Sequence, residues 1–404
     1  MFTIPRDRVV SLDPYSDAST SDQLAAHDEL REAGEVVYLE KYGVYASGRF
    51  DIVNRLFREW ESFEVGSGIG LVHLKRDTNG FPMGGRYGQT SIIESDPPWH
   101  DPLRRAASTV IGPRKLRALR PVWMAEANTL IDGLAGRDRI DGASEIAHVF
   151  PQRVFPDALG IREKEREDLA LFGAYLFNQS GPPNQLSHYM EDRIPAIREW
   201  IAEHTRREAL EPGSIATDVW EAADRGEINY EQSAAIVFAL LAAGIDTTVN
   251  GIAAAIVSLA RHPDQYERVR QDPSLARIAF DEALRVESPV TAMFRAATTD
   301  MEVGGITIPA GEKILLSIPG ANRDPRRWDR PTEFDLDRDP SGHLGFGIGL
   351  HQCVGQHVAR LEAESIITAI TSRVTSLELA GDVVMQPNNR MRIFESIPLA
   401  VEWD

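Results

Sequence analysis

The sequence has few of the features that mark secreted, membrane-bound or nucleic-acid-binding proteins. It has 404 residues and one cysteine, which excludes an internal disulfide and any zinc or iron–sulfur site held by several cysteines. Lys and Arg total 43 against 61 Asp and Glu, giving a formal charge of −18. So acidic a chain lacks the phosphate-neutralising surface that nucleic acid or anionic lipid requires. We therefore expect a cytoplasmic protein that binds neither nucleic acid nor membrane.

Long apolar runs are also missing. The longest, residues 234–245, has 12 residues, whereas a membrane-spanning helix needs about 20. The first eight residues are charged and interrupted by Pro5, unlike a signal peptide. No low-complexity linker, charge block or internal repeat marks a boundary, so we expect a single domain over residues 1–404.

Helical patterns dominate what is present, and a smaller part alternates like strands. Amphipathic stretches predict helices at 116–134 and 195–210. The apolar-rich residues 230–261 predict one 32-residue helix, about 48 Å long at 1.5 Å per residue. Alternation predicts strands within three segments, 36–49, 301–318 and 376–401. The predicted fold class is mainly α with a minor β part.

Three segments are irregular enough to suggest function. Residues 66–88 hold seven glycines among 23 residues, which predicts a mobile surface loop that includes a short helix. Residues 177–184 break two helical patterns, and residues 323–351 form a long coil rich in Asp, Arg, Pro and Gly. A coil of that length inside a compact chain is usually functional or disordered, and its apolar anchors favour function.

The cysteine follows that coil directly. Residues 346–355 read Phe-Gly-Ile-Gly-Leu-His-Gln-Cys-Val-Gly and lead into a helical pattern. An isolated cysteine is most often a small buried hydrophobe. Here, however, glycines allow the backbone to lie against a flat ligand, and the start of a helix favours the thiolate. Haem iron is the metal centre that takes a single cysteine ligand.

This segment resembles the haem-binding signature of the cytochrome P450 superfamily, Phe-Gly-x-Gly-x-His-x-Cys-x-Gly. The resemblance implies the cytochrome P450 fold, with haem b between the long central helix and the helix after the Cys loop. It also implies Cys353 as the iron ligand, with Phe346 and Gly347 beside the haem. The chain would then be an O2-dependent monooxygenase.

Two further motifs support the resemblance. Glu282 and Arg285 match the superfamily's Glu-x-x-Arg pair, which locks its helix to the coil before the cysteine. Many relatives complete this pair with an arginine where this chain has Glu333, so either Arg323 or Arg338 is expected to substitute.

The second motif lies in the long helix, where residues 243–248 read Ala-Gly-Ile-Asp-Thr-Thr. Standing alone, it would predict a helix kink caused by Thr hydroxyls. By resemblance it is the oxygen-activating groove, in which the small Ala243 and Gly244 leave room for O2. Thr247 is then the oxygen-stabilising alcohol and Asp246 the proton relay.

The resemblance further implies which residues bind the two haem propionates and which proteins supply electrons to the haem. The propionate partners are His100, Arg104, Arg295 and His351. No flavin or nicotinamide motif is present, so we expect electrons from an iron–sulfur ferredoxin and its NAD(P)H reductase, as in class I systems. Residues 101–120 carry six Arg or Lys and one Asp, a basic segment suited to an acidic ferredoxin.

The expected substrate pocket is apolar and partly aromatic, which suits a small planar aromatic substrate. By resemblance it draws on Phe177, Ser180, Phe238, Ala239, Ala242, Ala243, Val290, Met293, Phe294 and Phe394. The chain as a whole looks like bacterial cytochromes P450 that oxidise para-substituted benzoates and remove O-methyl groups.

Those relatives hold the carboxylate with polar and basic residues where this chain has Phe238 and Ala239. Residues Arg86, Gln89, Thr90 and Ser91 offer another anionic anchor, so methoxyphenols and other neutral aromatics remain open beside methoxybenzoates. The alternatives are a hydroxylase of a terpenoid or other secondary metabolite and a haem-based sensor. The Asp-Thr pair argues against the sensor, because a sensor does not protonate O2.

Overall fold

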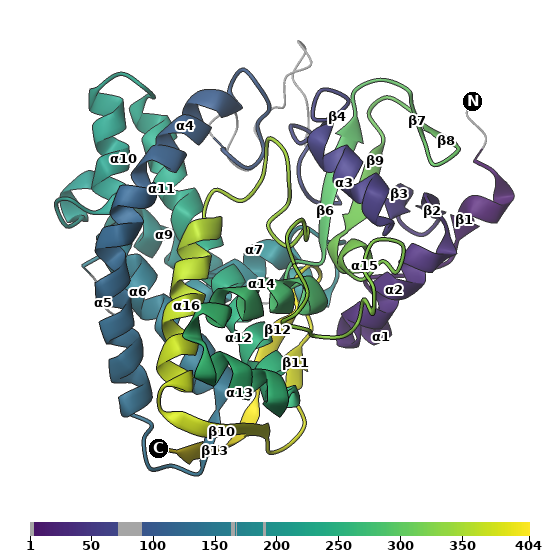
Figure 1. The fold of residues 1–404 in the computed structure, drawn as a ribbon. Coiled ribbons are helices and arrows are strands. Elements are labelled where there is room, and N and C mark those ends of the chain that lie inside the picture. Colours follow the sequence, from purple (N-terminus) through teal and green to yellow (C-terminus); the bar gives the residue numbers. More distant parts are fainter. Residues whose placement is uncertain (1–3, 72–90, 163–165, 167, 189–190) are drawn as a thin grey trace.

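The computed structural model describes the chain except for residues 1–3, 72–90, 163–165, 167 and 189–190. Helices make up most of the described chain and strands a smaller part, as the sequence predicts. The strands within residues 9–64 and 292–317 gather with the N-terminal helices on one side of the molecule, whereas the C-terminal strands lie with the larger helical part (Figure 1). Most of the predicted 66–88 loop falls outside the described residues.

The helices follow one another along the whole chain. They are α1 (Asp17–Ser21), α2 (Gln23–Ala33), α3 (Phe50–Arg58), α4 (His100–Val110), α5 (Pro113–Asp132), α6 (Val149–Leu159), α7 (Asp168–Asn178), α8 (Gln185–His188), α9 (Ile194–His204), α10 (Ile215–Asp224), α11 (Tyr230–Gly244), α12 (Asp246–Arg261), α13 (Pro263–Gln271), α14 (Ala276–Glu287), α15 (Ile318–Asn322) and α16 (Gln356–Thr371).

The strands are short and form sheets of unequal size. They are β1 (Val9–Val10), β2 (Val37–Leu39), β3 (Val44–Ser47), β4 (Phe63–Glu64), β5 (Arg139–Asp141), β6 (Ala292–Ala297), β7 (Met301–Val303), β8 (Ile306–Ile308), β9 (Lys313–Ser317), β10 (Val374–Leu379), β11 (Val384–Gln386), β12 (Ile393–Ser396) and β13 (Pro398–Trp403). All three segments with predicted strands contain them.

The largest sheet among the described residues has the strand order β1-β2-β3-β9-β6-β4. The β2–β3 hairpin turns at Gly43, whose φ of +62° lies in the left-handed region that glycine tolerates. Strand β6 pairs antiparallel with β9, so that Met293 lies opposite Leu316 and Arg295 opposite Ile314. Because side chains alternate along a strand, Met293 and Arg295 share one face.

The predicted 32-residue central helix is interrupted. Helix α11 ends at Gly244 and α12 begins at Asp246, with Ile245 between them, so the prediction of one continuous helix is wrong. The hydroxyl of Thr248 donates to the carbonyl of Gly244 at 3.0 Å, and that of Thr247 to Ala243 at 2.7 Å. Threonine hydroxyls that bond the preceding turn compete with the helix ladder and bend it.

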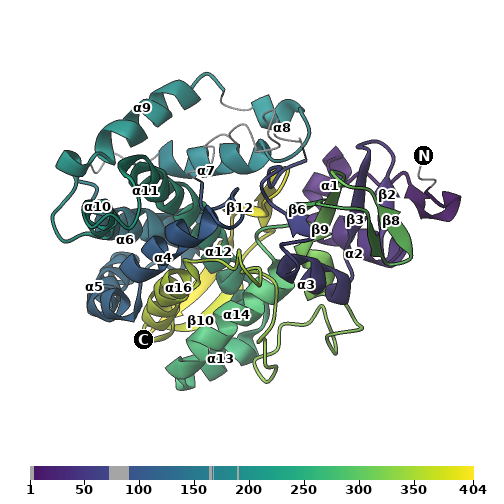
Figure 2. The same ribbon diagram turned by 90° about the horizontal axis from the view of Figure 1, so that it is seen from above.

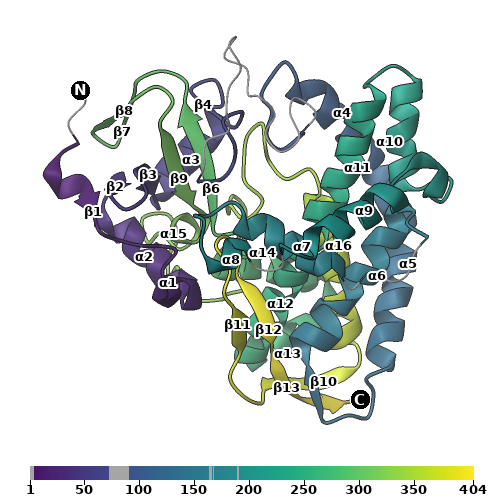
Figure 3. The same ribbon diagram turned by 180° about the vertical axis from the view of Figure 1, so that it is seen from behind.

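Residues Tyr230–Arg261 are long and apolar enough to cross a membrane by length and composition alone. In the structure, however, 61% of their most apolar window is buried, and α12 lies deep among α14, α16 and the C-terminal strands (Figure 3). The central core helix of a soluble protein passes the same test. This segment is therefore weak evidence for a membrane span.

Helices α14 and α16 pack on α12, and the coil between α15 and α16 wraps over them (Figure 2). Arg285 forms a fully buried ion pair with Glu282 at 2.8 Å and donates to the carbonyls of Asn322, Pro331 and Glu333. Arg338 completes the network, because its Nε lies 3.0 Å from Glu282. Arg323 binds Asp28 instead, which settles the choice left open by the sequence.

Candidate functional site

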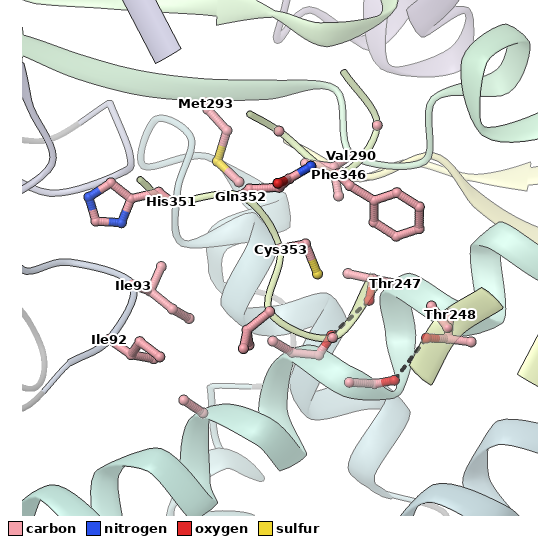
Figure 4. A pocket seen from close by; sticks show the side chains of 18 of the residues that line it. Ile92, Ile93, Thr247, Thr248, Val290, Met293, Phe346, His351, Gln352 and Cys353 are labelled. Carbon is pink, nitrogen blue, oxygen red and sulfur yellow. Dashed lines mark hydrogen bonds between the residues drawn. The ribbon is translucent and has the colours of Figure 1, made fainter. Parts of the chain in front are cut away.

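A cavity of about 290 Å³ lies where α4, α11, the start of α12, β6 and residues 345–355 meet. Its wall is mostly apolar, with a few cationic side chains on the side of β6 and α4. In Figure 4, Cys353 stands near the centre, with Thr247 and Thr248 below it and Met293 and His351 above. Elements far apart in sequence therefore bring together the residues singled out by the motifs.

The Cys loop is held in shape by its own backbone. The N–H of Cys353 donates to the carbonyl of Phe346 at 2.8 Å, and Gly347 and Gly349 adopt φ of +62° and +78°. A Cβ on Gly349 would lie 2.8 Å from the carbonyl oxygen of Phe57, so this glycine also allows close packing. The loop presents the Cys353 side chain, which is exposed, to the cavity that it lines.

Electrostatic effects on the Cys353 thiol oppose one another. The Cys353 side chain is open to the cavity but lies deep inside the protein, so desolvation raises its pKa, while the N–H groups of Gly355 and Gln356 and the charge of Arg104 favour the thiolate. The helix that follows the loop, α16, begins at Gln356, so its N-terminal amides account for part of this effect. A cation bound on the sulfur would complete the stabilisation of the thiolate.

Two arginines line the cavity close to the Cys loop. Arg104 donates from Nη1 to the carbonyl of Gln352 at 2.5 Å, which fixes α4 against the loop. Arg295 is buried, and its Nε has no hydrogen-bond partner in the described part of the chain. Burial lowers the pKa of Arg295 to about 10. A buried guanidinium with an unused donor requires an acceptor.

His351 and His100 form an edge-on ring pair beside the arginines. Their ring centroids lie 4.5 Å apart, and His351 lines the cavity with its Nε2 3.3 Å from Asp96. His100 is fully buried behind it and is not part of the cavity wall. Neither ring nitrogen of His100 has a hydrogen-bond partner among the described residues, and burial, aided by His351, lowers its pKa to about 4.

This donor set fits a haem. One sulfur faces the cavity from a loop with two left-handed glycines, and Phe346 and Gly347 line the wall beside it. The unused donor of Arg295, with Arg104 and His351 nearby, matches the two carboxylates that a haem carries. No group of three or more His, Cys, Asp or Glu among the described residues is placed to hold a bare metal ion.

The Asp-Thr motif divides between the cavity and the core. Thr247 lines the cavity, whereas Asp246 is buried and packs against α7, where a Cβ on Gly173 would lie 2.4 Å from its Oδ2. That oxygen has no hydrogen-bond partner among the residues described, and burial raises the carboxyl pKa well above its usual range. Burial therefore favours the neutral, protonated form of this carboxyl.

Gly244 of this motif allows close packing between helices and also lines the cavity. A Cβ on Gly244 would lie 2.2 Å from Cε1 of Phe155 in α6, so that ring rests directly on the helix backbone. Ala243, by contrast, is exposed to the cavity. The open groove at the break in the helix is therefore formed by Ala243 and Thr247, with Phe155 closing its far side.

The structure brings together part of the expected substrate pocket. Five of its residues line the cavity, namely Phe177, Ala239, Ala243, Val290 and Met293. The other five lie outside the wall, namely Ser180, Phe238, Ala242, Phe294 and Phe394.

Local contacts explain the position of these other residues. Phe238 packs edge-on against Phe172 of α7, with ring centroids 5.9 Å apart. The Phe394 ring is buried, and its N–H donates to Asn250 at 3.0 Å. Ser180 hydrogen-bonds the preceding helical turn through its hydroxyl, and Phe294 is buried on the face of β6 opposite Met293. Ala242 packs on the helical core.

Several wall residues were missed by sequence reasoning. They include Ile69, Ile92, Ile93, Phe155, Leu240 and Arg390. Isolated isoleucines in irregular segments carry no periodic signal, and Arg390 lies between two short strands. An arginine beside a run of apolar C-terminal residues was the one available signal for that position.

The alternative anionic anchor is largely untested by the structure. Arg86, Gln89 and Thr90 lie outside the described residues. The Ser91 hydroxyl accepts the N–H groups of Ile93 and Glu94 at 3.3 and 3.1 Å, so it closes a turn.

The basic segment at 101–120 is partly neutralised. Lys115 pairs with Asp218 and Arg120 with Glu364, while Arg104 turns into the cavity. Arg105, Arg114 and Arg117 are exposed and have no ion-pair partner among the described residues. They lie on α4 and α5, and α5 packs along α16, the helix that follows the Cys loop.

Comparison with known proteins agrees with this geometry. The family model for cytochrome P450 matches residues 184–393. The chain is 42% identical over 391 residues to cytochrome P450 CYP199A2 of Rhodopseudomonas palustris, covering 96% of this chain and 93% of that one.

Solved structures match over nearly the whole chain. Cytochrome P450 CYP109Q5 from Chondromyces apiculatus superposes with a TM-score of 0.80 at 27% identity, over 98% of this chain and 99% of that one. Cytochrome P450 CREJ, solved with (4-ethylphenyl) dihydrogen phosphate, gives a TM-score of 0.81 at 25% identity, over 96% and 99% of the two chains.

A helical fold that presents one cysteine to a cavity, opposite a threonine at a broken helix, defines a haem-thiolate oxygenase. The chain belongs to the cytochrome P450 family. It is a haem-thiolate monooxygenase, and like other members it accepts electrons from redox partners and binds O2 and an organic substrate.

Proposed function

We propose that the protein oxidises a small aromatic substrate, by hydroxylation or by oxidative O-demethylation of a methoxybenzoate or methoxyphenol, in aromatic compound catabolism. Electrons come from an iron–sulfur ferredoxin and its NAD(P)H reductase, and the protein works in the cytoplasm as one domain. The observation that carries the proposal is the cavity itself, which is apolar and lined by Phe177, Val290 and Met293 around Cys353. Such a wall suits a flat ring.

Two further observations support an aromatic substrate. The sequence resembles bacterial cytochromes P450 that oxidise para-substituted benzoates. The structural neighbour CREJ was solved with a small para-substituted phenyl phosphate. In this chain Ile92 and Ile93 line the cavity on the side opposite Val290 and Phe346, which adds apolar surface to both sides (Figure 4).

We propose that Cys353 ligates the haem iron and that Arg104, Arg295 and His351 bind the propionates, with Phe346 and Gly347 against the ring. His100 positions His351 through their ring contact. A bound haem would supply the activation of O2 and the insertion of one of its oxygen atoms into a C–H bond, with two electrons from the redox partners. Hydroxylation of a methoxy carbon gives a hemiacetal that releases formaldehyde and a phenol, with the second oxygen atom leaving as water.

Thr247 and Asp246 are proposed to deliver protons. The Thr247 hydroxyl donates to Ala243, so its oxygen lone pairs face the cavity as acceptors. Burial raises the pKa of Asp246 and so favours its protonated form, which suits a proton source one residue from Thr247. Its carboxyl faces α7, so transfer to Thr247 needs a water or a side-chain rotation.

Titration of the substrate-induced spin-state change tests the substrate class. We expect 4-methoxybenzoate, guaiacol or syringol to shift the haem towards high spin and to yield formaldehyde with the matching phenol. A shift with terpenes and none with any of these aromatics would contradict the proposal.

A further inference from the structure

Arg390 is a buried cation in the wall of an otherwise apolar cavity. It lies between β11 and β12, and its side chain is 2% exposed. The guanidinium lies 5.8 Å from the Phe177 ring centroid and contacts the sulfur of Met293 through Nη2. It therefore belongs to the part of the cavity formed by substrate-pocket residues.

The structure holds this side chain firmly. Its Nε donates to the carbonyl of Ala292 at 2.5 Å, and its backbone N–H donates to the side chain of Asn388 at 3.0 Å. The N–H and hydroxyl of Thr291 both donate to the carbonyl of Arg390, at 2.9 and 3.0 Å. The guanidinium is thus fixed on the edge of the main sheet before any ligand arrives, which reduces the entropy lost on binding.

No acidic side chain pairs with Arg390 in the described structure. Two other buried arginines do have such a partner: Arg285 pairs with Glu282, and Arg392 pairs with Glu287 at 2.6 Å. The Nη1 of Arg390 has no hydrogen-bond partner among the described residues, and the thioether on Nη2 is a weak acceptor. A buried guanidinium without a counter-ion is costly, so the site lacks an anion.

The surroundings of Arg390 add to this excess of positive charge. The charge of Arg390 disfavours the charges of the nearby Arg295 and Lys313, whereas Tyr15 and Glu94 favour the charge of Arg390. Burial lowers the pKa of Arg390 to about 10, and burial together with the charge of Arg390 lowers the pKa of Lys313 to about 8. Both remain cationic at neutral pH and attract an anion.

We infer that Arg390 binds the carboxylate of an anionic aromatic substrate inside the cavity, an inference that rests on the proposed function. The planar guanidinium matches a carboxylate in a bidentate geometry, and Phe177 and Met293 contact the ring of the same molecule. This anchor lies on the C-terminal segment, whereas α11 carries Phe238 and Ala239 where benzoate-oxidising relatives have polar residues. It favours methoxybenzoates over methoxyphenols as substrates.

Spin-state titration of the holoenzyme with matched ligands tests the anchor. The first pair is 4-methoxybenzoate and 4-methoxybenzamide, which differ in charge but hardly in shape, and the second is decanoate and decanamide. The wild type should prefer each carboxylate. Arg390→Gln should weaken carboxylate binding about 10- to 100-fold and change amide binding less than about 2-fold. Arg390→Lys, which keeps the charge without the fork, should fall between.

The control is Arg392→Gln. Arg392 lies two residues after Arg390 and is also buried, but it pairs with Glu287. This variant should leave the ratio of carboxylate to amide affinity unchanged, because Arg392 already has Glu287 as its counter-ion. A general loss of stability would weaken both ligands equally and would not change the ratio. Haem content is measured for every variant. An unchanged ratio in Arg390→Gln would overturn the inference. Loss of haem with equal weakening of both ligands would overturn it too, since Arg390 would then bind a propionate.

The two pairs separate this inference from the proposed function. Preference for decanoate that depends on Arg390, without binding of either aromatic, would support the anchor and contradict the aromatic substrate. Binding and demethylation of the aromatic amide, without any preference for carboxylates, would support the aromatic substrate and overturn the anchor. A wild type that binds no carboxylate overturns the anchor.

Discussion

Arg338 offers a sharp test of how the coil before the Cys loop is held. Its side chain is 10% exposed, and its Nε contacts the fully buried Glu282 at 3.0 Å. Its other nitrogens donate to the carbonyls of Asp329 and Arg330 at 2.5 and 3.1 Å. Arg338→Gln removes one charge-assisted bond worth about 1.5–3 kcal/mol and two carbonyl bonds worth about 1 kcal/mol each, partly replaced by water. We expect a net loss of about 2–4 kcal/mol.

Arg330→Gln is the matched control in the same coil. Arg330 also contacts two acids, Glu333 at 2.9 Å and Asp335 at 2.6 Å, but its side chain is 55% exposed. Exposed pairs contribute about 0–1 kcal/mol, so this variant should lose less than about 1 kcal/mol. Urea unfolding of the holoprotein, followed by circular dichroism and haem absorbance, measures both. Equal losses in the two variants would refute the assignment of Arg338 to the buried network.

Three further predictions concern protons and electrons. Thr247→Ala should raise NADH consumption per product, measured with oxygen uptake, because the hydroxyl that faces the cavity is lost. Burial raises the pKa of Glu362, so folding stability is full at low pH and falls as pH rises towards the folded pKa. Glu362→Gln removes that fall, and its advantage in free energy of unfolding should grow as pH rises above the ordinary glutamate pKa of 4.5. Arg114→Glu with Arg117→Glu should slow reduction by ferredoxin at low salt and leave substrate affinity unchanged.

Each of these predictions has its own control. Thr247→Ser keeps the hydroxyl and should keep coupling, and equal uncoupling in both threonine variants would contradict the role of that group. For Glu362, a pH profile parallel to that of the wild type would show that its carboxyl is not the titrating group. Arg198→Glu with Arg206→Glu makes the same charge change on exposed residues in and just after α9. Slower reduction there as well would point to net charge instead of a docking surface.

The sequence predicted the helical fold and the motif residues because both depend on local patterns. Helical periodicity and the residue spacing around Cys353 can be read from the sequence without knowing how the helices and strands pack together. The break at Ile245 was missed as an element boundary because an apolar run continues through it, although the threonines that bend the helix were recognised. Arg338 could not be chosen over Arg323 because the choice depends on how the coil folds back onto Glu282.

The substrate pocket was less predictable. Phe238 and Ala239 are neighbours on α11, yet Ala239 lines the cavity and Phe238 packs against α7. That division depends on the rotation of one helix against its neighbours, which periodicity does not specify. Met293 and Arg295 share a face of β6 because side chains alternate along a strand, but the place of β6 beside β9 in the sheet decides what that face meets. Arg390 belongs to no motif, and its position depends on contacts with Ala292 and Asn388.

The carbon monoxide difference spectrum of the reduced protein tests the central claim most directly. Haem iron with the Cys353 thiolate opposite carbon monoxide should give the long-wavelength band of thiolate-ligated haem. Cys353→His should move that band to the position of histidine-ligated haem while the protein retains its fold by circular dichroism. A wild-type band at the neutral-thiol position, or one unchanged by the substitution, would contradict ligation of the haem iron by the Cys353 thiolate.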